Sequence, residues 1–250
     1  MTRKIHVILK KEDLVMERLA GKIAVVFDII LATSTITAAL EQGAEAVIPV
    51  YDREEAVEVS SAFPSSSVVL AGEYNGKSME GFLDPYPKEL GKRIKEKTLI
   101  LSTTNGSVAL KKAESAKKLY AASLLNTEAV AADIVKHYQN ETILLICGGS
   151  RGSFSMEDFY GAGYMVDCLL SLHSFQLTDA AKTAQLFYRS QKDHPYELLR
   201  LTRIGKILSR YSYDDELDFI SQKSVFTVVP RLKDGKLIHV ENEHNGQPHF

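Results

Sequence analysis

The sequence has no tryptophan and only two cysteines among its 250 residues. Cys147 and Cys168 cannot form a disulfide framework, and both lie in apolar segments, so we expect them in the core of a strand or helix and the protein in a reducing cytoplasm. Long apolar runs are missing as well. The one at the N-terminus is too short for a signal peptide and none reaches membrane-spanning length, so we expect no membrane partner.

An excess of positive charge is also absent. The chain has 30 lysines and arginines against 32 aspartates and glutamates, which gives a formal net charge of −2. This balance argues against a nucleic-acid partner, because bulk attraction to a phosphate backbone needs a basic surface. A small anionic ligand must therefore meet cations that the fold gathers locally.

In the first part of the chain, short apolar runs alternate with segments of helical periodicity. The predicted strands are Ile5–Leu9, Ile23–Ile29, Ala46–Val50, Val68–Ala71, Leu99–Ser102, Lys118–Ala122 and Ile143–Cys147. The predicted helices between them are Thr35–Gln42, Arg53–Phe63, Ser107–Ala116 and Glu128–His137. This alternation indicates βαβ units, so we expect an α/β fold with a mostly parallel sheet and flanking helices.

The pattern becomes helical after Glu157. The predicted helices are Asp158–His173, Asp179–Ser190, Tyr196–Tyr211 and Asp214–Ser221, and a hairpin is predicted from Val225–Leu232 and Lys236–Val240, which flank an Asp-Gly pair. We therefore divide the chain into an α/β sheet region with the site, residues 1–155, and a helical region with a C-terminal hairpin packed on it, residues 156–250. The two regions can also form one continuous domain.

Polar residues follow five of the predicted strands. In chain order they are Asp28, Thr33 and Ser34; Glu73; Thr103, Thr104 and Asn105; Ser123 and Asn126; and Arg151, Glu157 and Asp158. Ligands bind beyond the carboxyl ends of parallel strands, so this repeated placement favours an active site. Each residue singly can instead end a strand, form a turn or cap a helix. Ser155, for example, is a good N-cap for a helix whose first turn holds Glu157 and Asp158.

The residue types indicate a metal and a phosphate. The carboxylates of Asp28, Glu73, Glu157 and Asp158 are hard oxygen donors that suit Mg²⁺, and the hydroxyls after the fifth predicted strand, at a helix start, suit an anion. No zinc spacing, GxxxxGK[ST] motif or GxGxxG motif is present, so zinc, P-loop and dinucleotide sites are not expected. The long loop Tyr74–Lys88 is expected to border the site.

Several blocks taken together resemble the 2-phosphosulfolactate phosphatases, Mg²⁺-dependent enzymes of sulfolactate and coenzyme M metabolism. The blocks are DIILATST at Asp28–Thr35, GE at Gly72–Glu73, EGF at Glu80–Phe82, TTNGSVAL at Thr103–Leu110, SLLN at Ser123–Asn126 and GSFSMED at Gly152–Asp158. The resemblance covers nearly the whole chain. It implies a cytoplasmic α/β enzyme, a homo-oligomer, that hydrolyses 2-phospho-3-sulfolactate to 3-sulfolactate and phosphate.

The resemblance also implies roles for the strand-end residues. Asp28, Glu157 and Asp158 are expected to hold Mg²⁺. Asp28, Glu73 and Arg151 are the expected catalytic residues, with Glu73 as a ligand or general base and either Asp28 or water as the nucleophile. The phosphate and the rest of the substrate are expected to contact Thr33, Ser34, Thr103, Thr104, Asn105, Ser123 and Asn126.

Three departures from the family pattern lie in segments of the predicted site. The family usually has arginine where this chain has Leu31, a basic residue where it has Tyr74, and a longer loop in place of Phe82–Pro87. Two of these changes remove positive charge. Another cation from elsewhere in the fold can compensate for Leu31, and the candidates are Arg151, Arg200, Arg203 and Lys206. Two alternatives also stay open: a phosphatase for a less charged phosphoester, or a diverged family member that binds an anion without turnover.

Overall fold

The structure is a computed structural model and describes residues 3–239. Its strands are β1 (Lys4–Ile8), β2 (Ile23–Phe27), β3 (Ala46–Val50), β4 (Val68–Tyr74), β5 (Lys77–Ser78), β6 (Thr98–Ser102), β7 (Lys118–Ala121), β8 (Ile143–Cys147), β9 (Gln176–Leu177), β10 (Pro230–Lys233) and β11 (Lys236–His239). Within the described residues they form one sheet in the order β5-β4-β6-β3-β11-β10-β7-β2-β8-β1-β9. The predicted α/β class is confirmed.

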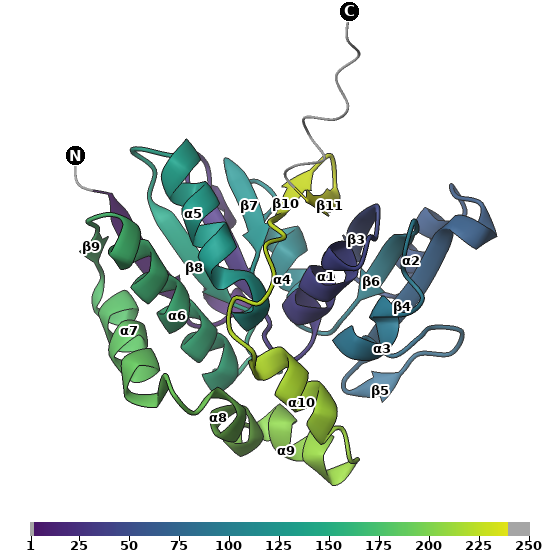
Figure 1. The fold of residues 1–250 in the computed structure, drawn as a ribbon. Helices are drawn as coiled ribbons and strands as arrows, with labels where there is room; N and C mark the ends of the chain where they lie inside the picture. The colour runs from purple at the N-terminus through teal and green to yellow at the C-terminus, as the bar shows by residue number, and fades with distance from the viewer. Residues whose placement is uncertain (1–2, 240–250) are drawn as a thin grey trace, which may run out of the picture.

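The helices are α1 (Ala32–Glu41), α2 (Arg53–Ser60), α3 (Pro87–Gly91), α4 (Gly106–Ala113), α5 (Thr127–His137), α6 (Met156–Leu172), α7 (Asp179–Gln191), α8 (Pro195–Leu201), α9 (Arg203–Arg210) and α10 (Asp214–Ser221). Short 3-10 turns lie at η1 (Lys11–Asp13), η2 (Met16–Arg18), η3 (Ser65–Ser67) and η4 (Leu124–Asn126). In Figure 1, α5, α6 and α7 lie in front of one part of the sheet, and α8, α9 and α10 gather at the lower end of the molecule.

Most neighbouring strands are parallel, as expected, but the C-terminal hairpin is antiparallel and lies inside the sheet. β10 pairs with β7 through Arg231 and Tyr120, and β11 pairs with β3 through Leu237 and Val47. The hairpin thus joins the two parallel halves of the sheet, whereas the sequence analysis placed it on the helical region. The division at residue 155 itself stays a prediction.

The buried strands carry apolar residues on both faces, which is why their sequences read as continuous apolar runs. In β2, Ile23, Val25 and Phe27 belong to a core with residues of α5, α6 and α7. The alternate residues Ala24 and Val26 belong to a second core with residues of α1 and α4. Because helices cover both faces of the sheet, polar residues can meet a ligand at the ends of the strands.

Several element boundaries differ from the prediction. The helix expected over Tyr196–Tyr211 is two helices, because Thr202 ends α8 in an extended conformation and its side chain caps α9. The strand predicted over Val225–Leu232 begins only at Pro230, and residues 225–229 have no regular secondary structure. The predicted strand Lys236–Val240 is β11, and Val240 lies outside the described residues.

The cysteines lie where the sequence analysis expected them, Cys147 buried at the end of β8 and Cys168 partly buried in α6. Across residues 3–239, no helix combines the length and the apolar character needed to cross a membrane.

Candidate active site

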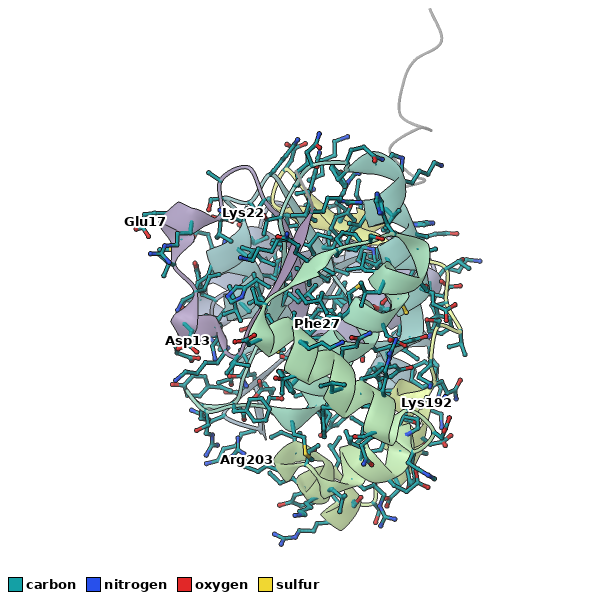
Figure 2. All side chains as sticks on the ribbon, turned by 90° about the vertical axis from the view of Figure 1, so that its left-hand side faces the viewer. Asp13, Glu17, Lys22, Phe27, Lys192 and Arg203 are labelled. Atoms are coloured by element: carbon teal, nitrogen blue, oxygen red, sulfur yellow. The ribbon has the colours of Figure 1, made fainter. Side chains whose placement is uncertain are left out.

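The carboxyl ends of β2, β4, β6 and β8 open onto one cavity of about 620 Å³. It receives Asp28, Glu73, Thr104, Asn105, Arg151, Glu157 and Asp158 from the predicted site. The long loop contributes Asn75 to Ser78 and Asp84 to Tyr86, so its predicted position is confirmed. In Figure 2, Phe27, the last residue of β2, lies in the interior, and Arg203 lies below it on the helical part.

Asp28 is the first residue after β2 and faces the cavity. Its backbone is fixed by Thr33, whose hydroxyl accepts from the Asp28 N–H at 3.1 Å and donates to the Asp28 carbonyl at 3.0 Å. The N–H of Gly106, the first residue of α4, donates to the Asp28 carboxylate. A Cβ at Gly106 would lie 2.5 Å from that carboxylate, so only glycine allows this approach.

Burial raises the pKa of Asp28 to about 7, and the nearby charges of Glu73 and Glu157 add to the effect. The pKa values of Glu157 and Asp158 are raised from their ordinary values, first by burial. For Asp158, the charges of Asp28 and Glu157 contribute further. The site thus concentrates negative charge that a cation would relieve.

Asp158 ties two strand ends together. Its Oδ1 accepts from the Ile29 N–H at 2.9 Å and its Oδ2 from the Gly149 N–H at 3.0 Å. Ser155 caps α6, because its hydroxyl accepts from the Asp158 N–H at 3.3 Å. Capping and a place in the cavity therefore coexist at Glu157 and Asp158, which answers the alternative left open by the sequence.

Glu73 holds the turn after β6 against the loop after β4. Its Oε1 accepts from the Thr104 N–H at 2.7 Å, and its Oε2 accepts from the Thr104 hydroxyl at 3.1 Å and the Gly76 N–H at 2.6 Å. Both carboxylate oxygens are thus engaged by the protein. In this structure Glu73 positions Thr104, and its predicted role as ligand or base stays a prediction.

Lys11, in the turn after β1, is a residue that the sequence analysis missed. Only 6% of it is exposed, and its Nζ donates to Asn105 Oδ1 at 2.8 Å and to the Gly148 carbonyl at 3.3 Å. It also pairs with Glu12 at 2.9 Å, and its charge lowers the pKa of Asp28 against the larger effect of burial. The pattern of polar residues after strands extends to β1, and reading it there would have found Lys11.

Three arginines line the cavity. Arg151 lies in the glycine turn with φ 51°, and its guanidinium donates to the Asn75 carbonyl at 2.8 Å. Arg203 donates to the Ser150 hydroxyl, and its charge acts against the rise in the pKa of Glu157. Arg210 ends α9. Of the cations considered as compensation for Leu31, Arg151 and Arg203 line the cavity and Arg200 and Lys206 do not, whereas Arg210 was not predicted.

Five residues predicted to bind the substrate lie outside the lining of the cavity. The Ser34 hydroxyl donates to the Ile29 carbonyl, and Thr103 bonds with Ser107 at the start of α4. Ser123 and Asn126 form a capping box at η4. Together with Thr33, these side chains are buried and fix the strand ends. Their contacts are structural in this structure, and their predicted contact with substrate stays a prediction.

The departures from the family pattern divide into two kinds. Leu31 lines the cavity, and so do Asp84, Pro85 and Tyr86 of the shortened loop. Tyr74 is exposed and is not part of the lining. The loss of positive charge at Leu31 therefore concerns the cavity directly, whereas that at Tyr74 does not.

The acids of the cavity are suited to a divalent cation that keeps part of its water shell. Among residues 3–239, no three histidine, cysteine, aspartate or glutamate side chains are grouped so that they could hold one ion together. Mg²⁺ does not need such a cage, since it usually takes one or two carboxylates, several waters and a substrate phosphate. Asp28 and Glu157 both line the cavity, and the charge of Glu157 adds to the rise in the pKa of Asp28, so the residues present fit this mode of binding.

The chain is similar to known proteins over nearly its whole length. A family profile described as 2-phosphosulpholactate phosphatase matches residues 8–235. A protein of Clostridium beijerinckii named "Probable 2-phosphosulfolactate phosphatase" is 34% identical over 237 residues, 94% of this chain and 98% of the relative. Relatives of the same name from Caldanaerobacter subterraneus and Clostridium perfringens are each 38% identical, and cover 87% and 96% of this chain and 90% and 97% of their own length.

Proposed function

Because the chain belongs to the 2-phosphosulpholactate phosphatase family, whose members are phosphoric monoester hydrolases, we propose that it is a Mg²⁺-dependent enzyme that hydrolyses 2-phospho-3-sulfolactate to 3-sulfolactate and phosphate. The observation that carries the proposal is the set of buried carboxylates with raised pKa values around Asp28, at the rim of a cavity that arginines also line. Acids alone would repel a phosphoester, so a divalent cation between them and the phosphate is required.

In this proposal Asp28 and Glu157 hold Mg²⁺, and Asp158 holds the backbone of Ile29 and Gly149 so that both acids face the cavity. When bound, Mg²⁺ supplies Lewis-acid polarisation of the phosphoryl group and neutralises charge that develops on its oxygens. Both carboxylate oxygens of Asp158 accept hydrogen bonds from these backbone N–H groups, and its role as a further ligand stays a prediction.

The phosphoryl oxygens are held by Asn105, Arg151 and Arg203. Lys11 donates to Oδ1 of Asn105, so the amide group of Asn105 must present its Nδ2 hydrogens elsewhere, and Asn105 lines the cavity. The guanidinium groups have five donors each and spend few of them on the protein. Donors placed before the reaction need no reorganisation as charge develops, which is the main source of rate enhancement in such sites.

Two nucleophiles are compatible with this arrangement, a water molecule and the Asp28 carboxylate. Stereochemistry separates them, because a single displacement by water inverts a chiral ¹⁸O-labelled phosphorus and a phosphoenzyme on Asp28 gives retention. Trapping the phosphoenzyme would identify Asp28 directly.

The test of the proposed function is phosphate release from 2-phospho-3-sulfolactate, measured with Mg²⁺ and with EDTA. We expect turnover with Mg²⁺ and its loss in EDTA, and no turnover in Glu157→Ala or Asp28→Asn. Turnover that persists in EDTA contradicts the metal assignment. Thermal stabilisation by the ligand without phosphate release would instead support an anion-binding protein.

A further inference from the structure

Helix α9 forms one wall of the cavity with Arg203, Ile204, Ile207 and Arg210. The two arginines are seven residues apart, so they lie within about 20° of one face of the helix and about 10 Å apart along its axis. Between them the wall is apolar. An anionic group of a ligand therefore finds a cation at either end of α9 and none in its middle.

The surroundings of the two arginines differ. Arg203 lies at the end of the cavity that holds the acids, because it donates to the Ser150 hydroxyl and its charge lowers the pKa of Glu157. For Arg210, none of residues 3–239 accepts a hydrogen bond from it or forms an ion pair with it. A guanidinium that faces a cavity and has no acceptor in the described protein is free to bind an oxyanion of the ligand.

Helix geometry directs Arg210 toward the substrate. The Cα–Cβ bonds of a helix tilt toward its N-terminus, which favours an Arg210 side chain directed toward the turn that holds Ile207, and both residues line the cavity. Leu31 and Tyr86 also line the cavity and bring no charge. With Arg151 and Arg203 assigned to the phosphate, the cations of the cavity lining that are left for the other end of a multiply charged ligand are Arg210 and Lys77.

We propose that α9 carries a second anion subsite, in which Arg210 binds the sulfonate or carboxylate of the substrate while Arg203 serves the phosphate end. This inference rests on the proposed function and names its specificity-determining residue. The subsite distinguishes phosphoesters that bear a further acidic group from simple phosphate esters. It also means that residues of the helical region discriminate between these substrates, whereas the acids at the strand ends serve the phosphate that all of them share.

The test compares three substrates: 2-phospho-3-sulfolactate, 2-phospholactate, which lacks the sulfonate, and p-nitrophenyl phosphate, which lacks both groups. Loss of one charge-assisted contact should lower kcat/KM for phosphosulfolactate by about 10- to 150-fold in Arg210→Ala, mainly through KM. Hydrolysis of p-nitrophenyl phosphate should change little. Phospholactate identifies the group bound: a loss there assigns Arg210 to the carboxylate, and no loss there assigns it to the sulfonate.

Two variants provide controls. Lys206→Ala removes an exposed cation of α9 that is not part of the cavity lining, and it should leave all three substrates unchanged. Arg203→Ala should lower kcat/KM for all three, because Arg203 serves the phosphate. Equal losses on every substrate in Arg210→Ala, or no loss on any, would overturn the proposal.

A binding measurement separates this inference from the proposed function. If the wild-type protein releases phosphate from none of the three esters, the proposed function fails. Calorimetric titration with 3-sulfolactate then tests the subsite alone, with tight binding to the wild type and weak binding to Arg210→Ala as the expected result. Equal binding to both proteins would reject the subsite.

Discussion

At the scale of single residues, Lys11 shows how a buried charge can act through a neighbour. It is buried between the turns after β6 and β8, and donates to Asn105 Oδ1 and to the Gly148 carbonyl. An amide has one acceptor and two donors, so occupying the oxygen decides which atoms of Asn105 are left for the cavity. Lys11 is thus a positioning residue for Asn105.

The coupling of Lys11 and Asn105 predicts a non-additive pair of variants. Lys11→Met and Asn105→Ala should each lower kcat/KM by roughly 10-fold or more, because each removes the same oriented donors. The double variant should be no worse than the poorer single one. Lys10→Met is the matched control, since Lys10 is partly exposed, donates to the Gly152 carbonyl and pairs with Asp13, and it should keep wild-type activity. Multiplying losses in the double variant would show that the two residues act independently.

At the scale of elements, the corner between α8 and α9 decides where the arginines lie. The Thr202 hydroxyl accepts from the Gly205 N–H at 3.0 Å and donates to the Leu199 carbonyl at 2.8 Å. Gly205 packs so closely that a Cβ there would lie 1.8 Å from the Leu199 carbonyl oxygen. Glycine is therefore needed for close approach, although its position is inside a helix where it costs stability.

Replacing Gly205 by alanine should displace α9 from the cavity. We expect a loss of about 1–3 kcal/mol in the free energy of unfolding from overpacking, measured by urea denaturation. The fold should remain, and kcat/KM for phosphosulfolactate should fall because Arg203 and Arg210 move together. Lys206→Ala, in the same helix but exposed, should retain both stability and activity. Wild-type activity in Gly205→Ala would show that the placement of α9 is not required.

At the scale of the whole molecule, the fold gathers acids that are far apart in the sequence. The acids lie at the end of β2, in β4 and in α6, and they line one cavity although the net charge of the chain is only −2; they are Asp28, Glu73, Glu157 and Asp158. Asp28, Glu157 and Asp158 have raised pKa values in the folded protein. Folding therefore costs free energy whenever these groups are ionised.

This cost predicts how stability depends on pH. The folded state holds protons that the unfolded state has already released above about pH 4, so the stabilisation present at low pH is lost as pH rises through about 7. In EDTA the midpoint temperature of thermal unfolding should decrease as the pH is raised from 5 to 8. Mg²⁺ should raise this midpoint temperature more at pH 8 than at pH 5. His6, whose pKa is lowered by burial, acts in the opposite sense below its ordinary pKa.

Asp28→Asn is the control for the pH dependence, since it removes one titrating group and should flatten the fall. Midpoints in EDTA that stay level or rise from pH 5 to pH 8 in the wild type would contradict the assignment. An equal effect of Mg²⁺ at both pH values would contradict the link between the acids and the cation.

The sequence by itself determined many of the local elements and the mostly parallel character of the sheet. The strands Ala46–Val50 and Ile143–Cys147 were predicted with their observed bounds, because an apolar run of this length between turn signals suits a buried strand and is too short for a typical helix. Placing the acids at strand ends followed from the same reasoning, since carboxyl ends of parallel strands share one edge of the sheet. Asp28, Asn105 and Glu157 were found in this way.

Only the tertiary structure decided which polar residues reach the cavity and which hold the backbone. Thr33 and Ser34 follow a strand just as Asp28 does, but their hydroxyls bond to local carbonyls, and hydrogen bonds of that kind leave no signature in a sequence. Lys11 and Arg210 reach the site through β1 and α9, at sequence separations for which no periodicity carries information. The physical reason is that local patterns record what a segment buries, whereas a site depends on which segments the packing of the whole chain brings together.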